Sequence, residues 1–133
     1  MKSIEELREF FKGDAYATST TGIEILEVGE GYAKVGLGID ERHINAGHRV
    51  MGAVYYTMAD FAFAVASNVN AGEEPMTFTL SSNINFLTAA KGTKLTAEAR
   101  AMRQGRKVSF FAAEVRDEFG TLVATVTSNG IKV

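Results

Sequence analysis

The chain of 133 residues contains no cysteine, no tryptophan, one proline and only two histidines. Without cysteine it can form no disulfide, no thiolate nucleophile and no cysteine-ligated metal centre, which fits a reducing compartment, so we expect a cytoplasmic protein. His43 and His48 are too few for a histidine metal cage within one chain, and we expect neither a metal nor a cofactor. The formal net charge of -2 gives no electrostatic reason to expect a nucleic acid as the main partner.

The remaining composition is that of a folded domain. Hydrophobic residues make up 46% and charged residues 23%, close to the averages for soluble globular proteins. The length predicts one domain, spanning residues 1–133, with one core. The N-terminal residues alternate charged and apolar side chains and lack the apolar stretch of a signal peptide.

The apolar periodicity changes along the chain and predicts an α+β fold. Ser3 and Glu6 form a capping-box pattern that opens a short amphipathic helix ending near Gly13. Two alternating runs around the turn Glu30-Gly31 then predict a hairpin. Residues 51–70 predict a long helix, and strand patterns follow over residues 77–86, 94–101, 108–115 and 122–133. We therefore expect a curved antiparallel sheet of about six strands wrapped around one central helix, with a short helix before it.

The predicted long helix is apolar on nearly every side and carries one charge, Asp60. It is long enough to cross a bilayer, but its alanines, its central acid and its place between patterned strands favour burial inside a soluble fold. A sheet on one side leaves half of such a helix uncovered. We expect a second copy of the chain to cover the rest; the alternative is that the N-terminal helix covers it.

Two places in this region are candidates for chemistry. Asp60 lies on a narrow face with Thr57, Ala64 and Ser67, and an acid in an apolar helix is costly unless it is paired or used. The alternative is a carboxylate that only hydrogen-bonds within the core. At the start of the helix, Gly52 would expose backbone N–H groups able to stabilise an oxyanion, although an ordinary helix start also tolerates glycine there.

The string Asn45-x5-Met51-Gly52-Ala53-x6-Asp60, the segment SSNINFLTAAKG and the turn RQGRK together resemble the PaaI-like acyl-CoA thioesterases of the hotdog superfamily. The resemblance implies a hotdog fold and hydrolysis of an acyl-CoA to a free acid and CoA. It also implies that Asp60 acts as nucleophile or general base, that the N–H of Gly52 polarises the thioester carbonyl, and that Asn45 positions that carbonyl or the water.

The chain departs from the family pattern in the same stretch. Met51 stands where the family usually has histidine, Ala53 where it has a second glycine, and His48 where glycine is common. Met51 and His48 remain candidates for substrate contact. His48 either compensates for the missing histidine or is a solvent-exposed loop residue.

Holding the CoA moiety requires partners for its phosphates and its pantetheine arm. Arg103, Arg106 and Lys107 flank the turn Gln104-Gly105 and are candidates for the phosphates, although such cations also occur at solvated hairpin tips. Ser82 and Asn83 belong to a polar row that also includes Ser81 and Asn85. These side chains are candidates for the pantetheine channel, or are simply the polar face of a strand.

Gly52 and Asp60 are eight residues apart, about 12 Å along a helix, so one carbonyl cannot touch both within a single chain. A site that uses both must combine two chains, and we expect a homo-oligomer. The leading hypothesis is an acyl-CoA thioesterase. A non-catalytic acyl-CoA or acyl-ligand binding protein on the same scaffold is the alternative; a dehydratase is disfavoured because the predicted helix offers no histidine.

Overall fold

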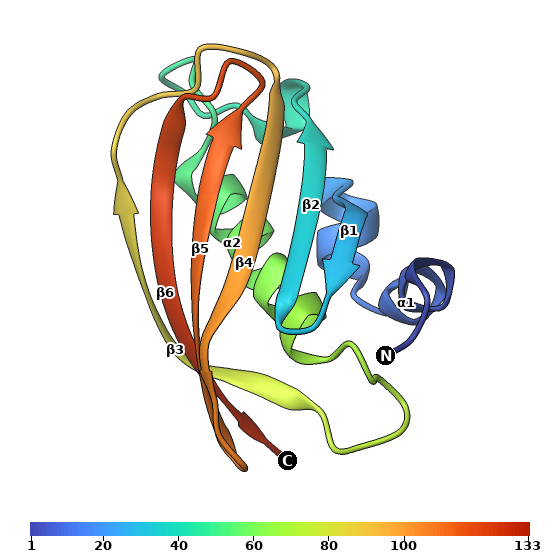
Figure 1. The fold of residues 1–133 in the computed structure, drawn as a ribbon. Helices are drawn as coiled ribbons and strands as arrows, with labels where there is room; N and C mark the ends of the chain where they lie inside the picture. Colours follow the sequence, from blue (N-terminus) through green and yellow to red (C-terminus); the bar gives the residue numbers. More distant parts are fainter.

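The computed structural model describes all 133 residues. The chain forms one sheet with a long helix packed against it (Figure 1). The helical elements are α1 (Ile4–Phe11), the π-helical turn η1 (Tyr16–Thr21), the 3-10 turn η2 (Glu41–His43) and α2 (Gly52–Ser67). The strands are β1 (Glu24–Gly29), β2 (Tyr32–Gly38), β3 (Thr77–Phe86), β4 (Lys94–Gln104), β5 (Val108–Asp117) and β6 (Leu122–Lys132). The predicted six-stranded α+β architecture is confirmed.

The six strands run antiparallel in the order β1-β2-β4-β5-β6-β3. β3 follows α2 in the chain but lies at the far edge of the sheet, where it pairs only with β6 (Figure 1). The outer edge of this ten-residue strand therefore has no partner in the chain. Unpaired edge strands of this length are open to pairing with another chain.

Helix α2 forms the centre of the core. Ten of its sixteen residues are buried, and the ring of Phe63 packs edge-on against that of Phe111 on β5, with 5.0 Å between centroids. The opposing sheet face carries small side chains, Ala97 and Ala99 among them, which are completely buried and allow the helix to approach closely. With sixteen residues, α2 is too short to span a membrane, and no other helix of the chain is a candidate.

The N-terminal segment covers more of α2 than the pattern predicted. Phe11 at the end of α1 packs edge-on against Phe61, and Ala17 of η1 is buried in the same core. The expectation that half of α2 lacks cover within one chain is therefore wrong, and the alternative of N-terminal cover is correct in part. What remains accessible is the start of the helix at Gly52 and Ala53 and a narrow stripe of Tyr56, Thr57, Asp60 and Ala64.

Local sequence patterns predicted α1 correctly and β3 only in part. Both hydrogen bonds of the Ser3/Glu6 capping box are present. In β3, by contrast, a register shift between Thr79 and Ser81 breaks the alternation, so that Phe78 is exposed whereas Ile84 packs against the core. The alternation over residues 77–86 predicts one apolar face made of Phe78, Leu80, Ile84 and Phe86. This prediction is wrong, because a bulge puts residues of equal parity on opposite faces.

Candidate active site

The first half of the candidate site lies where α2 begins. Met51 precedes the helix without a side-chain cap, and no acceptor in the chain takes the N–H of Gly52. Gly52 and Asn45 line one cavity of about 300 Å³ together with Phe86. A Cβ atom on Gly52 would lie 2.9 Å from the ring of Phe86, so any larger residue at this position requires that exposed ring to shift. The free N–H thus lies beside a cavity.

Asn45 organises the loop that leads into α2. Its side-chain oxygen accepts the backbone N–H groups of Gly47 and Arg49, at 2.9 and 3.2 Å. Both acceptor contacts use Oδ1, and the amide nitrogen Nδ2 has no partner in the chain. Asn45 therefore combines a structural role in the loop with two N–H donors that remain available to a ligand.

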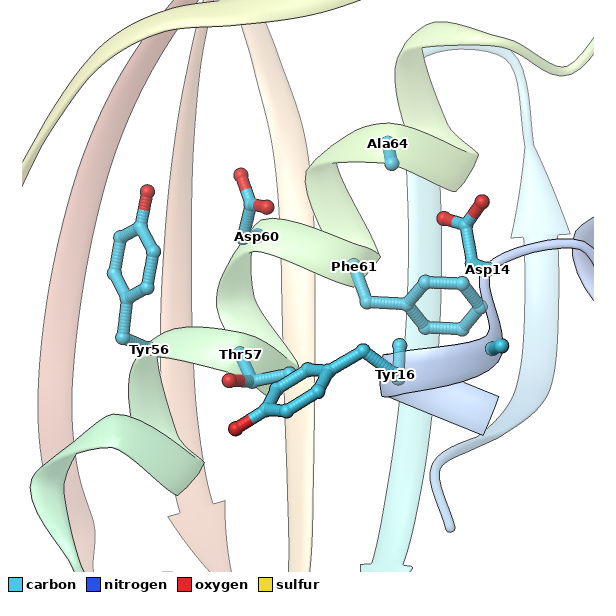
Figure 2. A pocket seen from close by; sticks show the side chains of 9 residues that line it. Asp14, Tyr16, Tyr56, Thr57, Asp60, Phe61 and Ala64 are labelled. Carbon is cyan, nitrogen blue, oxygen red and sulfur yellow. The ribbon is translucent and has the colours of Figure 1, made fainter. Parts of the chain in front are cut away.

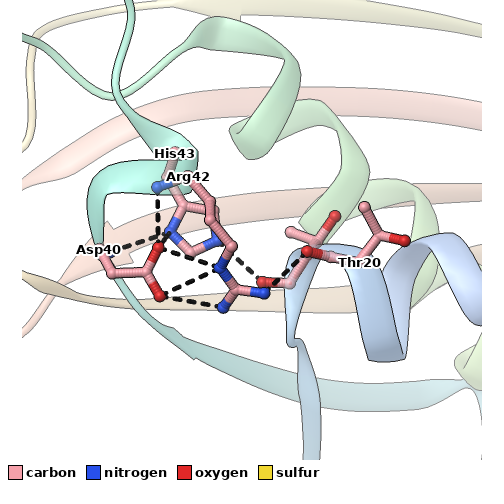
Figure 3. Close-up of polar contacts among 5 residues, drawn as sticks. Thr20, Asp40, Arg42 and His43 are labelled. Atoms are coloured by element: carbon pink, nitrogen blue, oxygen red, sulfur yellow. Dashed lines mark hydrogen bonds and ion pairs between the residues drawn. The ribbon is translucent and has the colours of Figure 1, made fainter.

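A cluster of polar contacts ties this loop to η1 (Figure 3). The buried ring of His43 accepts the Asp40 N–H through Nδ1 at 3.0 Å and donates from Nε2 to the Thr21 carbonyl at 2.8 Å. Arg42 donates to the Asp40 carboxylate and to the Thr20 carbonyl, and its guanidinium lowers the pKa of Asp40 to about 2. The loop before α2 and the N-terminal segment therefore form one connected unit.

The second half of the candidate site surrounds Asp60, in the middle of α2. The hydroxyl of Thr79 on β3 donates to Asp60 Oδ1 at 2.8 Å, and no basic side chain pairs with this carboxylate. Asp60 lines a cavity of about 330 Å³ with Asp14, Tyr16, Tyr56 and other residues (Figure 2). The carboxylate is thus oriented through one oxygen and not neutralised, as a base or nucleophile requires.

Sequence reasoning missed Thr79 and Asp14. Thr79 lies in the predicted strand of residues 77–86, but only the packing of β3 against α2 shows that it reaches Asp60. Asp14 lies between two helical elements, and no local pattern distinguishes it. The hydrogen bond of Thr79 and the place of Asp14 in the Asp60 cavity both depend on tertiary structure.

The candidates for CoA contact are only partly brought together. Ser82, Asn83 and Arg103 line one groove of about 570 Å³. Ser82 also accepts a hydrogen bond from the Tyr56 hydroxyl at 3.1 Å and lies 2.8 Å from the Ser128 hydroxyl.

The other predicted contact residues lie outside that groove. Arg106 and Lys107 are exposed near the β4–β5 turn, and like Arg103 they form no ion pair. Met51 is 52% exposed. His48 is exposed in its loop with a positive φ of 63°, as the solvent-exposed interpretation expected. These cations and loop residues are all accessible to a ligand.

Within one chain the two halves remain apart. Gly52 and Asn45 line one cavity, whereas Asp60 lines another, and no residue is shared between the two linings. No group of three or more His, Cys, Asp or Glu side chains lies close enough together to hold a metal ion. The chain therefore presents a donor half and a carboxylate half on one helix.

Comparison with known proteins identifies the class. Residues 47–124, more than half of the chain and including both Gly52 and Asp60, match the model of the thioesterase superfamily. The chain therefore belongs to the thioesterase superfamily, and its fold is the hotdog fold of PaaI-like thioesterases.

Individual relatives agree with this assignment. A protein of Archaeoglobus fulgidus named "Putative esterase" is 30% identical over 122 residues, covering 91% of this chain and 77% of the relative. The acyl-coenzyme A thioesterase PaaI of Escherichia coli is 27% identical over 124 residues, covering 92% and 86%. A thioesterase structure from Haemophilus influenzae superposes with a TM-score of 0.89 at 22% identity, covering 100% and 92%, which shows a shared fold.

Proposed function

We propose that this protein is an acyl-CoA thioesterase that hydrolyses its substrate to a free carboxylic acid and CoA in the cytoplasm. The observation that carries the proposal is a pair of groups on α2, the unpaired N–H of Gly52 and the carboxylate of Asp60, which has no cationic partner, in a member of the thioesterase superfamily. The E. coli relative, whose name gives acyl-coenzyme A as its substrate, supports the choice of thioester. The reaction consumes only the thioester and water.

Each group has a defined task in this reaction. The Gly52 N–H donates to the thioester carbonyl oxygen, which becomes negatively charged as the carbonyl carbon is attacked. Asp60 either takes a proton from the attacking water, or attacks the carbon itself to form a mixed anhydride that water then hydrolyses. In both routes the C–S bond breaks and the leaving thiolate takes up a proton. The Thr79 hydroxyl occupies Asp60 Oδ1 and leaves Oδ2 free to react.

The proposed site requires two chains. Because Gly52 and Asp60 are about 12 Å apart along α2, the donor half of one chain has to face the carboxylate half of another. The unpaired edge of β3 supports such an assembly, because pairing of two β3 strands would join two sheets. Asn45 enters the site with Gly52, since both line one cavity.

We assign the binding of the CoA moiety to the remaining candidate residues. Arg103, Arg106 and Lys107 have no acidic partners and suit the phosphates. Ser82 and Asn83 line the groove beside Arg103 and suit the amide groups of pantetheine. We place Met51 and His48, on the loop before Gly52, at the entrance for the thioester.

The decisive experiment is turnover of a panel of acyl-CoA esters by the purified protein and by Asp60→Asn. Asparagine keeps an acceptor for Thr79 but cannot act as a base, so we expect kcat to fall at least about 10³-fold with an unchanged Tm. Glu114→Gln, on the exposed face of β5, is the matched control and should retain full activity. Hydrolysis that persists in Asp60→Asn would sink the assignment.

The exposed Met51, where the family pattern has histidine, favours one other candidate, a non-catalytic binder of acyl-CoA. A binder would show a rise in Tm with CoA esters but no turnover by the unmodified protein. The same panel therefore separates the two functions.

A further inference from the structure

The cavity around Asp60 contains a second carboxyl group, that of Asp14. Asp14 lies between α1 and η1, and its carbonyl oxygen accepts both the backbone N–H and the hydroxyl of Thr18, at 2.9 and 3.0 Å. These bonds fix Asp14 at the start of η1. Figure 2 shows the side chains of Asp14 and Asp60 pointing in the same direction, Asp14 from the residues just before η1 and Asp60 from α2, and both line this cavity.

No positively charged side chain in this cavity compensates the negative charges of Asp14 and Asp60. None of its nine lining residues is a lysine, arginine or histidine, and the only other titratable groups are the phenols of Tyr16 from η1 and Tyr56 from α2. Neither Asp14 nor Asp60 takes part in an ion pair. The Thr79 hydroxyl is the one hydrogen-bond donor on either carboxylate, and it serves Asp60.

We propose that Asp14 is a positioning residue of this site, whose charge sets the pH range in which Asp60 takes up a proton. The proposal rests on the proposed function for the role of Asp60 as a base. Asp14 itself touches no reacting atom in this scheme. It acts through the field that its carboxylate produces in the shared cavity.

The electrostatics of Asp14 support the proposal. Partial burial raises the pKa of the Asp14 carboxyl, and the negative charge of Asp60 raises it further. The interaction of two negative charges is reciprocal, so replacing either carboxylate removes the repulsion that it exerts on the other.

The first test is the pH dependence of kcat/KM for an acyl-CoA ester. In Asp14→Asn we expect the acid limb to move to lower pH by about half a unit to one unit, since a neighbouring charge is removed. In about 1 M salt, where the Debye length is about 3 Å, this shift should shrink. Asp14→Glu keeps the charge and should retain the wild-type profile. Glu5→Gln, which removes an exposed acid of α1 outside the cavity, should also leave the pH profile of kcat/KM unchanged.

The second test does not require activity. Carboxyl ¹³C resonances of the two aspartates are followed through an acid titration in the unmodified protein, Asp14→Asn and Asp60→Asn. We expect the midpoint of each aspartate to fall when the other is replaced. Unchanged midpoints, or a pH profile of Asp14→Asn that coincides with that of Glu5→Gln, would overturn the proposal. Coupled midpoints in a protein that hydrolyses no CoA ester would instead refute only the thioesterase function.

Discussion

Asn45 uses the two ends of its side-chain amide differently, and one substitution separates them. Asn45→Asp keeps the oxygen that accepts the Gly47 and Arg49 N–H groups but replaces the free N–H donors by an anion. We therefore expect kcat/KM to fall about 10²-fold, because an acceptor now faces the thioester oxygen, while the Tm changes little. Steady-state kinetics and thermal melts of the same sample measure both.

Asn45→Ala provides the comparison. It removes both ends of the amide, so the loop N–H groups lose their acceptor and the Tm should fall together with activity. If Asn45→Asp were as active as the unmodified protein, Asn45 would belong to the loop and not to the site.

Single residues were predictable where they break a local pattern. Asp60 stands out as the one charge in an apolar helix, and Gly52 marks the start of that helix. Thr79 and Asp14 break no local pattern. Their relation to Asp60 arises because β3 and the segment before η1 pack against α2, and contacts across 19 or more residues leave no signal in one sequence.

Among the connecting elements, the loop of residues 87–93 depends on one buried acid, Asp117. Its carboxylate accepts backbone N–H groups from Lys91, Gly92, Phe119 and Thr121. Residues of this loop line the Gly52 cavity, and the Ala90 N–H donates to the Tyr55 hydroxyl at 3.3 Å. Asp117 thereby holds one wall of the donor half of the site.

The hydrogen bonds of Asp117 make stability depend on pH. Burial alone raises its pKa, but the hydrogen bonds from Lys91, Thr121 and Phe119 outweigh burial and lower the pKa from 3.8 to about 2. A lowered pKa in the folded state contributes stability above pH 3.8, and this contribution is lost as the pH falls through about 2. Asp117→Asn places an N–H₂ group against backbone donors, so its Tm at pH 7 should be several degrees lower.

Thermal melts between pH 7 and pH 2 check this prediction. The difference in Tm between the unmodified protein and Asp117→Asn should begin to narrow below about pH 4, where the unfolded chain takes up a proton, and continue to narrow toward pH 2, where the native carboxylate is protonated. Glu114→Gln on the same strand removes an exposed acid and should show no such convergence. A constant difference across the range would contradict the role given to the Asp117 charge.

Elements with a strong period were predictable, and those that interrupt a period were not. The capping box defined the start of α1, and uninterrupted apolarity defined α2 within three residues at its C-terminal end. The bulge in β3 was not predictable because the apolar residues before and after it, Phe78 and Ile84 among them, keep the same parity in the sequence. The π-helical turn η1 was missed because its threonines and serine have weak helix propensity, and packing against α2 determines its conformation.

At the scale of the whole molecule, the proposed two-chain site predicts complementation. Asp60→Asn and Asn45→Asp, unfolded together and refolded as a mixture, should give about a quarter of the unmodified activity, since half of the dimers are mixed and each mixed dimer has one intact site. Each variant refolded alone should be nearly inactive. Initial rates at equal total protein measure the recovery.

The double variant, with both substitutions on one chain, is the matched control. Mixed and refolded with an equal amount of unmodified chain, it should leave about a quarter of the full activity, because no mixed dimer then has an intact site. If each chain held a complete site, this mixture would retain about half, and the first mixture would recover nothing.

The strand order has a consequence for how the chain folds during synthesis. β1 and β2 form a local hairpin, and the second neighbour of β2 is β4. In contrast, β3 pairs only with β6, whose paired residues lie 38 to 55 positions later in the chain. A nascent chain with residues 77–86 already outside the ribosome would carry a strand without a pairing partner until residues 122–132 emerge. Delay at that stage, rather than loss of stability in the finished fold, is where aggregation of this protein would begin.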